Sequence, residues 1–77
     1  MTLELYYRAS CPFCLKVLAF MKDNNIEITL KDISATSDVR NDLIRIGGKQ
    51  QVPCLVIDGK PLYESDDIIN WLKENYK

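Results

Sequence analysis

Alternation of apolar and polar residues predicts two strands near the start of the chain. Residues 3–7 and 26–32 both follow this two-residue period. Between them, apolar residues recur at three- and four-residue intervals, which predicts a helix. Its buried residues would be Cys14, Val17, Leu18 and Met21. Pro12 suits the first position of this helix, and Asn24 or Asn25 suits its end. A strand, a helix and a strand within about 30 residues predict a βαβ unit with parallel strands.

Two further helices are expected in the second half of the chain. The first would follow N-cap oxygens within residues 34–37 and end at Gly47–Gly48. Its buried face would contain Val39, Leu43 and Ile46. For the last helix, Ser65 is the expected N-cap, and Asp66 and Asp67 favour its positive end. The apolar stripe of that helix would contain Ile68, Trp71, Leu72 and Tyr76.

A hairpin is predicted between these two helices. The apolar run 52–57 is typical of a buried strand, and Asp58–Gly59 is a strong signal for a two-residue turn. Residues 60–63 would return as an edge strand, because Pro61 has no N–H to donate to a neighbour. The predicted order is therefore βαβαββα, an α/β fold with a small mixed sheet and packed helices.

Length and composition limit the number of domains and exclude several classes of function. A chain of 77 residues forms at most one domain, predicted over residues 1–77. The net charge is −1 without a basic run, so nucleic-acid binding is not expected. No apolar stretch approaches the roughly 18 residues of a membrane span, and the N-terminus lacks the charge pattern of a signal peptide. We expect a cytoplasmic monomer without membrane contact.

Three cysteines and the absence of histidine restrict the chemistry further. An odd number of cysteines cannot all pair within the chain. Without histidine there is no cysteine–histidine dyad and no mixed cysteine–histidine zinc site, and a four-cysteine site lacks one ligand. No metal site is therefore expected. In a reducing compartment, a Cys-x-x-Cys pair favours redox chemistry over a structural disulfide.

The pair Cys11 and Cys14 is the candidate redox site. Cys11 falls at the N-cap of the predicted first helix, where the backbone N–H groups, the helix dipole and the nearby Arg8 all favour a thiolate. We expect a lowered pKa for Cys11 and a less exposed Cys14. Cys11 would then attack and Cys14 would resolve the mixed disulfide. Simple packing of both cysteines, or metal binding by the pair, is the alternative.

On these residues, the chain resembles a dithiol glutaredoxin of the thioredoxin-fold superfamily. The resemblance rests on residues 8–14, 51–53 and 65–67, which occur in the family's order and spacing. It implies a thioredoxin-like fold, with a four-stranded sheet and helices on both faces. It also implies a glutathione-dependent thiol–disulfide oxidoreductase, with glutathione as co-substrate and no tightly bound cofactor. Its partners would be proteins with disulfides or glutathione adducts, ribonucleotide reductase among the candidates.

The same resemblance implies how glutathione would be held. Pro53 would be a cis-proline beside the cysteines, and the backbone of Val52 would pair with the cysteinyl part of glutathione. Backbone N–H groups of Ser65 and Asp66 would bind the γ-glutamyl carboxylate. Asp66 or Asp67 would face the ammonium group.

At the other end of the ligand, Arg8 and either Gln50 or Gln51 would reach the glycyl carboxylate, and Phe13 would line the groove. Phe13, Arg8 and Gln51 stand where many family members have Tyr, Lys and Thr. Leu62-Tyr63-Glu64-Ser65 stands where most family members have Gly-Gly before the acidic helix start. Within it, Glu64-Ser65 resembles the glutathione-binding dipeptide of glutathione transferase N-terminal domains.

Two alternatives and one unassigned residue accompany this interpretation. The chain could carry an iron–sulfur cluster between two copies, although Pro12 is unfavourable for that role. It could also be a glutathione-binding module without significant reductase activity.

The third cysteine, Cys54, follows Pro53 in a predicted strand and would point to the opposite sheet face. We expect it to be a buried, unreactive thiol.

Overall fold

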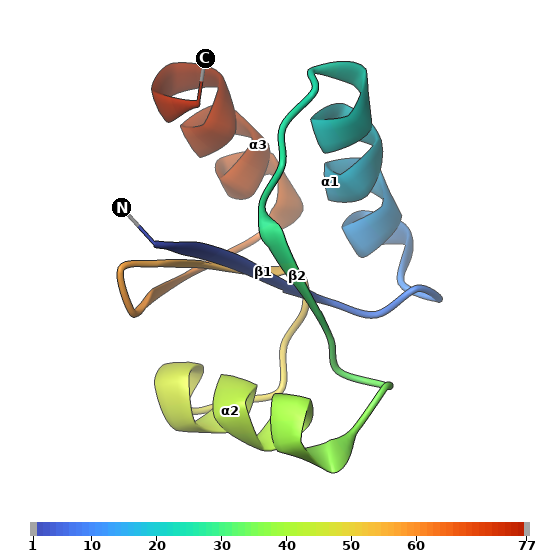
Figure 1. The fold of residues 1–77 in the computed structure, drawn as a ribbon, viewed down its shortest axis with the longest axis vertical. Helices are drawn as coiled ribbons and strands as arrows, with labels where there is room; N and C mark the ends of the chain where they lie inside the picture. The colour runs from blue at the N-terminus through green and yellow to red at the C-terminus, as the bar shows by residue number, and fades with distance from the viewer. Residues whose placement is uncertain (1, 77) are drawn as a thin grey trace.

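Four strands and three helices follow one another along residues 2–76, the part of the chain that the computed structural model describes (Figure 1). The elements are β1 (Leu3–Tyr7), α1 (Pro12–Asp23), β2 (Thr29–Asp32), α2 (Ser37–Gly47), β3 (Cys54–Ile57), β4 (Lys60–Tyr63) and α3 (Ser65–Asn75). This order is βαβαββα and confirms the order predicted from the sequence. None of the helices in this region is long and apolar enough to cross a membrane.

The sheet has the strand order β2-β1-β3-β4, with β1 and β3 in the centre. β1 and β2 are parallel, as the βαβ unit requires, whereas β3 is antiparallel to both β1 and β4. The turn between β3 and β4 uses left-handed backbone at Asp58 (φ 50°) and Gly59 (φ 84°), which confirms the predicted hairpin. β4 lies at the edge of the sheet, where Pro61 is tolerated.

Helices cover both faces of the sheet: α1 and α3 lie on one side and α2 on the other (Figure 1). Neighbouring residues of one strand supply both layers, because side chains alternate across a strand. In β1, Leu5 packs with the α1 and α3 residues Val17 and Ile68. The next residue, Tyr6, packs on the other face with Leu43 of α2. One pleated strand therefore anchors two separate hydrophobic clusters.

Three boundaries differ from the sequence prediction. β2 begins at Thr29 rather than near residue 26, and β3 begins at Cys54 rather than at residue 52. Leu30 is 46% exposed, because β2 is an edge strand that pairs only with β1. Ser65 is not the N-cap of α3. That position belongs to Glu64, whose left-handed φ of 71° turns the chain out of β4, so that Ser65 is the first helical residue.

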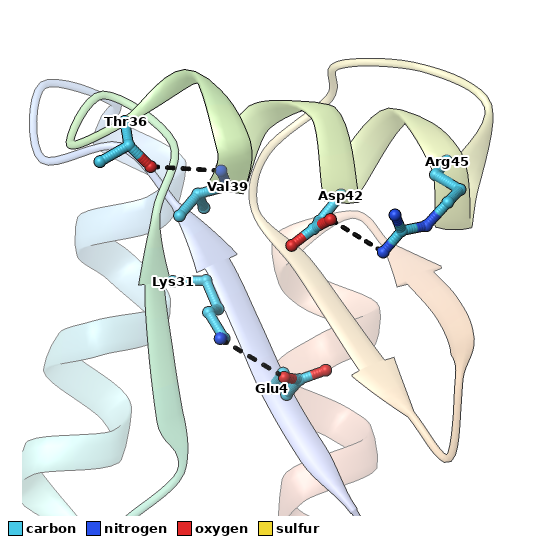
Figure 2. A network of polar contacts seen from close by, with 6 residues as sticks. All are labelled: Glu4, Lys31, Thr36, Val39, Asp42 and Arg45. Atoms are coloured by element: carbon cyan, nitrogen blue, oxygen red, sulfur yellow. Dashed lines mark hydrogen bonds and ion pairs between the residues drawn. The ribbon is translucent and has the colours of Figure 1, made fainter.

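Polar contacts fix the α2 side of the molecule (Figure 2). The Thr36 side chain accepts a hydrogen bond of 3.4 Å from the Val39 N–H and so caps α2. Lys31 of β2 and Glu4 of β1 form an ion pair of 3.8 Å across the two parallel strands, and Figure 2 shows both side chains on the α2 side. Polar side chains thus stabilise the start of α2 and the edge strand.

Candidate active site

Cys11 lies in the turn that joins β1 to α1. It is the N-cap of α1, with extended backbone (φ −89°, ψ 118°), and Pro12 occupies the first helical position, as predicted. The Cys11 N–H donates to the Arg8 carbonyl at 3.0 Å, and the Cys11 carbonyl accepts from Leu15 at the same distance. These two backbone bonds fix the thiol at the positive end of the helix, where it is partly exposed.

The position of Cys11 favours its thiolate. Partial burial opposes ionisation, but hydrogen bonding to the Cys14 N–H, the Cys14 thiol and the Phe13 N–H stabilises the charged sulfur. The positive charge of Arg8 adds to this effect, and the net result is a pKa below the ordinary value, as predicted. The Cys11 side chain makes no capping hydrogen bond of normal length and angle in this structure. The N–H groups at the start of α1 therefore favour the thiolate through their proximity and their positive ends.

Cys14 has the opposite tendency. It lies one turn into α1 and is completely buried. The pKa of Cys14 is raised to about 11, chiefly by burial and also by the hydrogen bond and charge of the neighbouring Cys11, against a lowering contribution from an Arg8 backbone hydrogen bond. Both cysteines are free thiols in this structure. The pair therefore combines one acidic, accessible thiol with one protonated, inaccessible thiol.

A groove of about 270 Å³ lies beside the cysteine helix. Its lining comes from the start of α1, the loop before β3 and the start of α3. The lining residues are Phe13, Gln51, Val52, Pro53, Glu64, Ser65 and Asp66. The Val52–Pro53 bond is cis, which confirms a sharp expectation of the family resemblance. Phe13 is 63% exposed, so this aromatic ring has more contact with solvent and the groove than with the core.

The structure brings together most, though not all, of the predicted ligand contacts. Six of the predicted residues line the groove, and Glu64 joins them. Arg8, Gln50 and Asp67 are exposed and are not part of the lining. Arg8 lies instead in the turn before Cys11, and Asp67 lies in the first turn of α3. The roles of all these residues toward glutathione remain predictions.

Two polar contacts occupy the rim of the groove. The Gln51 side-chain amide donates to the Glu64 carboxylate at 3.3 Å, which joins the loop before β3 to the turn before α3. Lys16 of α1 pairs with the Asp66 carboxylate of α3. Sequence reasoning missed Lys16, although a signal existed. Residues 13 and 16 lie on one flank of a helix, so the flank that presents Phe13 also presents Lys16.

Cys54 lies on the opposite face of the sheet, as predicted. It is completely buried in the cluster beneath α2, opposite Tyr63 in the β3–β4 register. Burial raises the pKa of Cys54. Within residues 2–76, no group of three or more His, Cys, Asp or Glu side chains could hold a metal ion. The lack of reactivity expected of Cys54 remains a prediction.

Comparison with known proteins identifies the family. The family model described as "Glutathione S-transferase, N-terminal domain" matches residues 5–77. Glutaredoxin 1 of Rickettsia prowazekii is 34% identical over 77 residues, covering 95% of this chain and 79% of that protein. The chain belongs to the glutaredoxin family. It is a glutaredoxin-like thiol–disulfide oxidoreductase of the thioredoxin fold, with Cys11 and Cys14 as its cysteine pair.

Solved structures agree with this assignment. The thioredoxin-like protein BC3987 superimposes with a TM-score of 0.78 at 29% identity, over 95% of this glutaredoxin-like chain and 97% of that protein. A delta-class glutathione transferase of Nilaparvata lugens gives a TM-score of 0.79 at 28% identity, over 96% of this chain and 36% of the transferase. Both parts of the sequence resemblance, to glutaredoxins and to transferase N-terminal domains, are therefore confirmed.

Proposed function

We propose that the chain reduces protein disulfides and glutathione mixed disulfides, with glutathione as the electron donor. The observation that supports this most strongly is the unequal acidity of Cys11 and Cys14 beside a groove walled by Phe13 and the cis Val52–Pro53 bond. The lowered pKa makes the first thiol the better nucleophile, whereas the second keeps its proton until a disulfide forms next to it.

The reaction begins with attack by the Cys11 thiolate on the glutathionyl sulfur of a mixed disulfide. A new sulfur–sulfur bond joins Cys11 to glutathione, and the substrate sulfur leaves with the electron pair and takes up a proton. A second glutathione thiolate then attacks the bound glutathionyl sulfur. This step releases oxidised glutathione and restores the Cys11 thiolate, so each turnover consumes one glutathione thiol and one mixed disulfide.

A protein disulfide takes a second route through Cys14. Cys11 attacks one sulfur of the disulfide and forms a mixed disulfide with the substrate. Cys14 then loses its proton and attacks the Cys11 sulfur, which releases the substrate as a dithiol and leaves a Cys11–Cys14 disulfide. Two glutathione molecules reduce this disulfide. The pKa of about 11 for Cys14 keeps it out of the first attack.

In this proposal, residues of the groove and of the turns beside it bind the separate parts of glutathione. The backbone of Val52, which lines the groove just before β3, would pair with the cysteinyl unit in the manner of an added strand. The N–H groups of Ser65 and Asp66 are at the start of an 11-residue helix, where they favour a carboxylate. Arg8 and Gln51 would bind the glycyl carboxylate, and Asp66 or Asp67 the ammonium group.

Partners and surroundings follow from this chemistry. Glutathione is the co-substrate, and no tightly bound cofactor is required. The macromolecular partners would be proteins that carry a disulfide or a glutathione adduct. The reaction needs a pool of reduced glutathione, for which a reducing compartment such as the cytoplasm is the expected setting.

The decisive experiment is a glutathione-coupled assay with a small mixed disulfide, in which glutathione reductase reports the oxidised glutathione formed. We expect Cys11→Ser to reduce turnover to the uncatalysed rate, because the attacking sulfur is lost. Cys14→Ser should retain turnover of mixed disulfides and lose the reduction of protein disulfides. Turnover that survives in Cys11→Ser would contradict the assignment of the nucleophile.

A second candidate function is glutathione binding without significant turnover. The match to the transferase N-terminal domain and the position of Glu64 and Ser65 in the groove lining favour it. Calorimetric titration with a thiol-blocked glutathione such as S-methylglutathione separates the two. Binding by a wild-type chain that is inactive in the coupled assay would select the binding module.

A further inference from the structure

The two carboxylates of the groove rim differ in whether a positively charged side chain pairs with them. Glu64 and Asp66 both belong to the lining. Glu64 accepts a hydrogen bond from the neutral Gln51 amide and so keeps its full negative charge. Asp66 instead pairs with the positively charged Lys16. The rim therefore contains one uncompensated carboxylate and one that is compensated by a residue outside the lining.

Lys16 is well placed to control this charge. Its side chain is 52% exposed and extends from α1 to the first turn of α3, so it connects the helix of Cys11 with the opposite wall of the groove. Three ion pairs occur within the described residues 2–76, and the other two involve Lys31 with Glu4 and Arg45 with Asp42. Of these three, the Lys16 pair is the one whose carboxylate lines the groove.

We propose that Lys16 is a specificity-determining residue that sets the charge of the ligand accepted by the groove. With Lys16 present, Asp66 is compensated, Asp67 is left to face the ammonium group, and the rim tolerates anionic disulfides. Without it, Glu64 and Asp66 would together repel them. Glutathione has two carboxylates and one ammonium group, so its disulfides are anionic. The inference deepens the proposed function and rests on it, since it names the residue that selects glutathione adducts over cationic disulfides.

The expected size of the effect follows from the exposure of the pair. Exposed ion pairs act in a medium of high dielectric constant, and a loss of one charge changes affinity for a singly charged ligand by about 2- to 5-fold. For ligands of opposite charge the two changes have opposite signs, so the ratio between them changes by about 5- to 20-fold. Salt screens charges that are more than about 10 Å apart at 0.1 M, and the effect must shrink at higher ionic strength.

The test measures this ratio in a single turnover of the reduced 77-residue chain. Oxidised glutathione is the anionic probe and cystamine is the cationic one. Mass spectrometry follows the adduct on Cys11 in a Cys14→Ser background, without any reducing substrate. We expect Lys16→Gln to lower the ratio of glutathione to cystamine rate constants by about 5- to 20-fold at low salt, and by less in 0.5 M sodium chloride.

Matched variants separate charge selection from other effects. Lys31→Gln removes the same charge and breaks an ion pair with Glu4 on the α2 side, and it should leave the ratio unchanged. Lys16→Arg keeps the charge and should preserve the wild-type ratio. The pH profile of Cys11 alkylation should be the same in Lys16→Gln and wild type, because the contacts that favour the thiolate come from Phe13, Cys14 and Arg8.

The inference is overturned if Lys16→Gln leaves the ratio unchanged, if Lys31→Gln changes it equally, or if Lys16→Arg behaves like Lys16→Gln. These outcomes are distinct from a failure of the proposed function. A wild-type chain without turnover in the glutathione-coupled assay would refute reductase function, whereas the single-turnover ratio would still report charge selection at Cys11.

Discussion

Cys11 and Cys54 each lie next to a proline, and the structure gives them opposite environments. Cys11 precedes Pro12 at the start of α1, partly exposed, with a lowered pKa. Cys54 follows the cis-proline Pro53 at the start of β3, completely buried, with a raised pKa. The adjacent residue in the sequence therefore does not determine reactivity.

The difference comes from which groups surround each sulfur. At Cys11, free backbone N–H groups at the start of α1 and the charge of Arg8 stabilise an anion. At Cys54, the side chain points beneath α2 into a cluster with Leu43 and Val56, where a charge would lose its hydration. One sheet thus separates a reactive thiol from an apolar one, and the following predictions test how complete that separation is.

The largest expected difference is in the rate of alkylation. In the reduced native chain at pH 7, iodoacetamide should modify Cys11 at least about 100-fold faster than Cys54, because the second thiol reacts only after local opening. Peptide mapping by mass spectrometry measures both rates. The Cys11 rate should also level off with rising pH below the ordinary thiol pKa of 9.0, since its thiolate forms early.

The unfolded chain provides the control. In concentrated urea, Cys11 and Cys54 should react at similar rates, because the helix N-terminus and the buried cluster are both lost. Equal rates in the native chain would show that the α2 layer opens freely, and the contrast between the two faces would then be wrong.

A smaller effect tests how tightly the Cys54 side is packed. A Cβ added at Gly47 would overlap the Tyr63 hydroxyl oxygen and lie 3.0 Å from its ring carbon Cζ, so Gly47→Ala must displace Tyr63. We expect a loss of about 1–3 kcal/mol in the free energy of unfolding, as for other overpacked sites. Urea denaturation measures it.

Tyr63→Phe offers the matching control for this site. Within residues 2–76, the buried Tyr63 hydroxyl lies near the weakly hydrogen-bonding Cys54 thiol but makes no hydrogen bond of normal geometry. Its removal should therefore cost little and should relieve most of the Gly47→Ala penalty in the double variant. Additive losses in the double variant would mean that the added methyl group disturbs the chain elsewhere.

The smallest predicted effect is a pH dependence of stability at Cys14. Because the folded state raises its pKa to about 11, it binds this proton more tightly than the unfolded chain does. The stabilisation is complete below the ordinary pKa of 9.0 and is lost as the pH rises through about 11. From pH 8 to 10, wild type should lose about 1 kcal/mol more than Cys14→Ala in urea denaturation. Equal losses would contradict the shift.

Much of the fold could be predicted because local signals agreed with the tertiary structure. Pro12 marked the start of α1, Asp58–Gly59 marked the hairpin, and the hydrophobic periods separated strands from helices. The sequence did not reveal that Leu30 would be 46% exposed, since alternation indicates which face a residue occupies and not how far a neighbouring helix extends over it. Nor did it reveal the left-handed backbone at Glu64, which moved the start of α3 by one residue relative to the predicted cap.

The sequence predicted only some residues of the candidate site, because some contacts depend on how the helices pack. Motifs identified Cys11, Cys14 and the groove residues around Pro53, because family spacing records which segments meet. Lys16 belongs to no motif, and its pairing with Asp66 depends on the packing of α1 beside α3. The placement of Cys54 away from the reactive pair followed from strand alternation alone.

The antiparallel pairing of β1 with β3 joins two parts of the site that come from different parts of the sequence. The chain after β1 contributes the nucleophile Cys11, with Phe13 and Lys16 on α1, whereas residues 51–66 contribute the other lining residues of the groove. Backbone pairs from Leu3–Ile57 to Tyr6–Cys54 join the parts and depend little on side chains at the site. In protein engineering, replacing groove-lining residues within 51–66 offers a route to a new ligand preference while the reactive thiol stays unchanged.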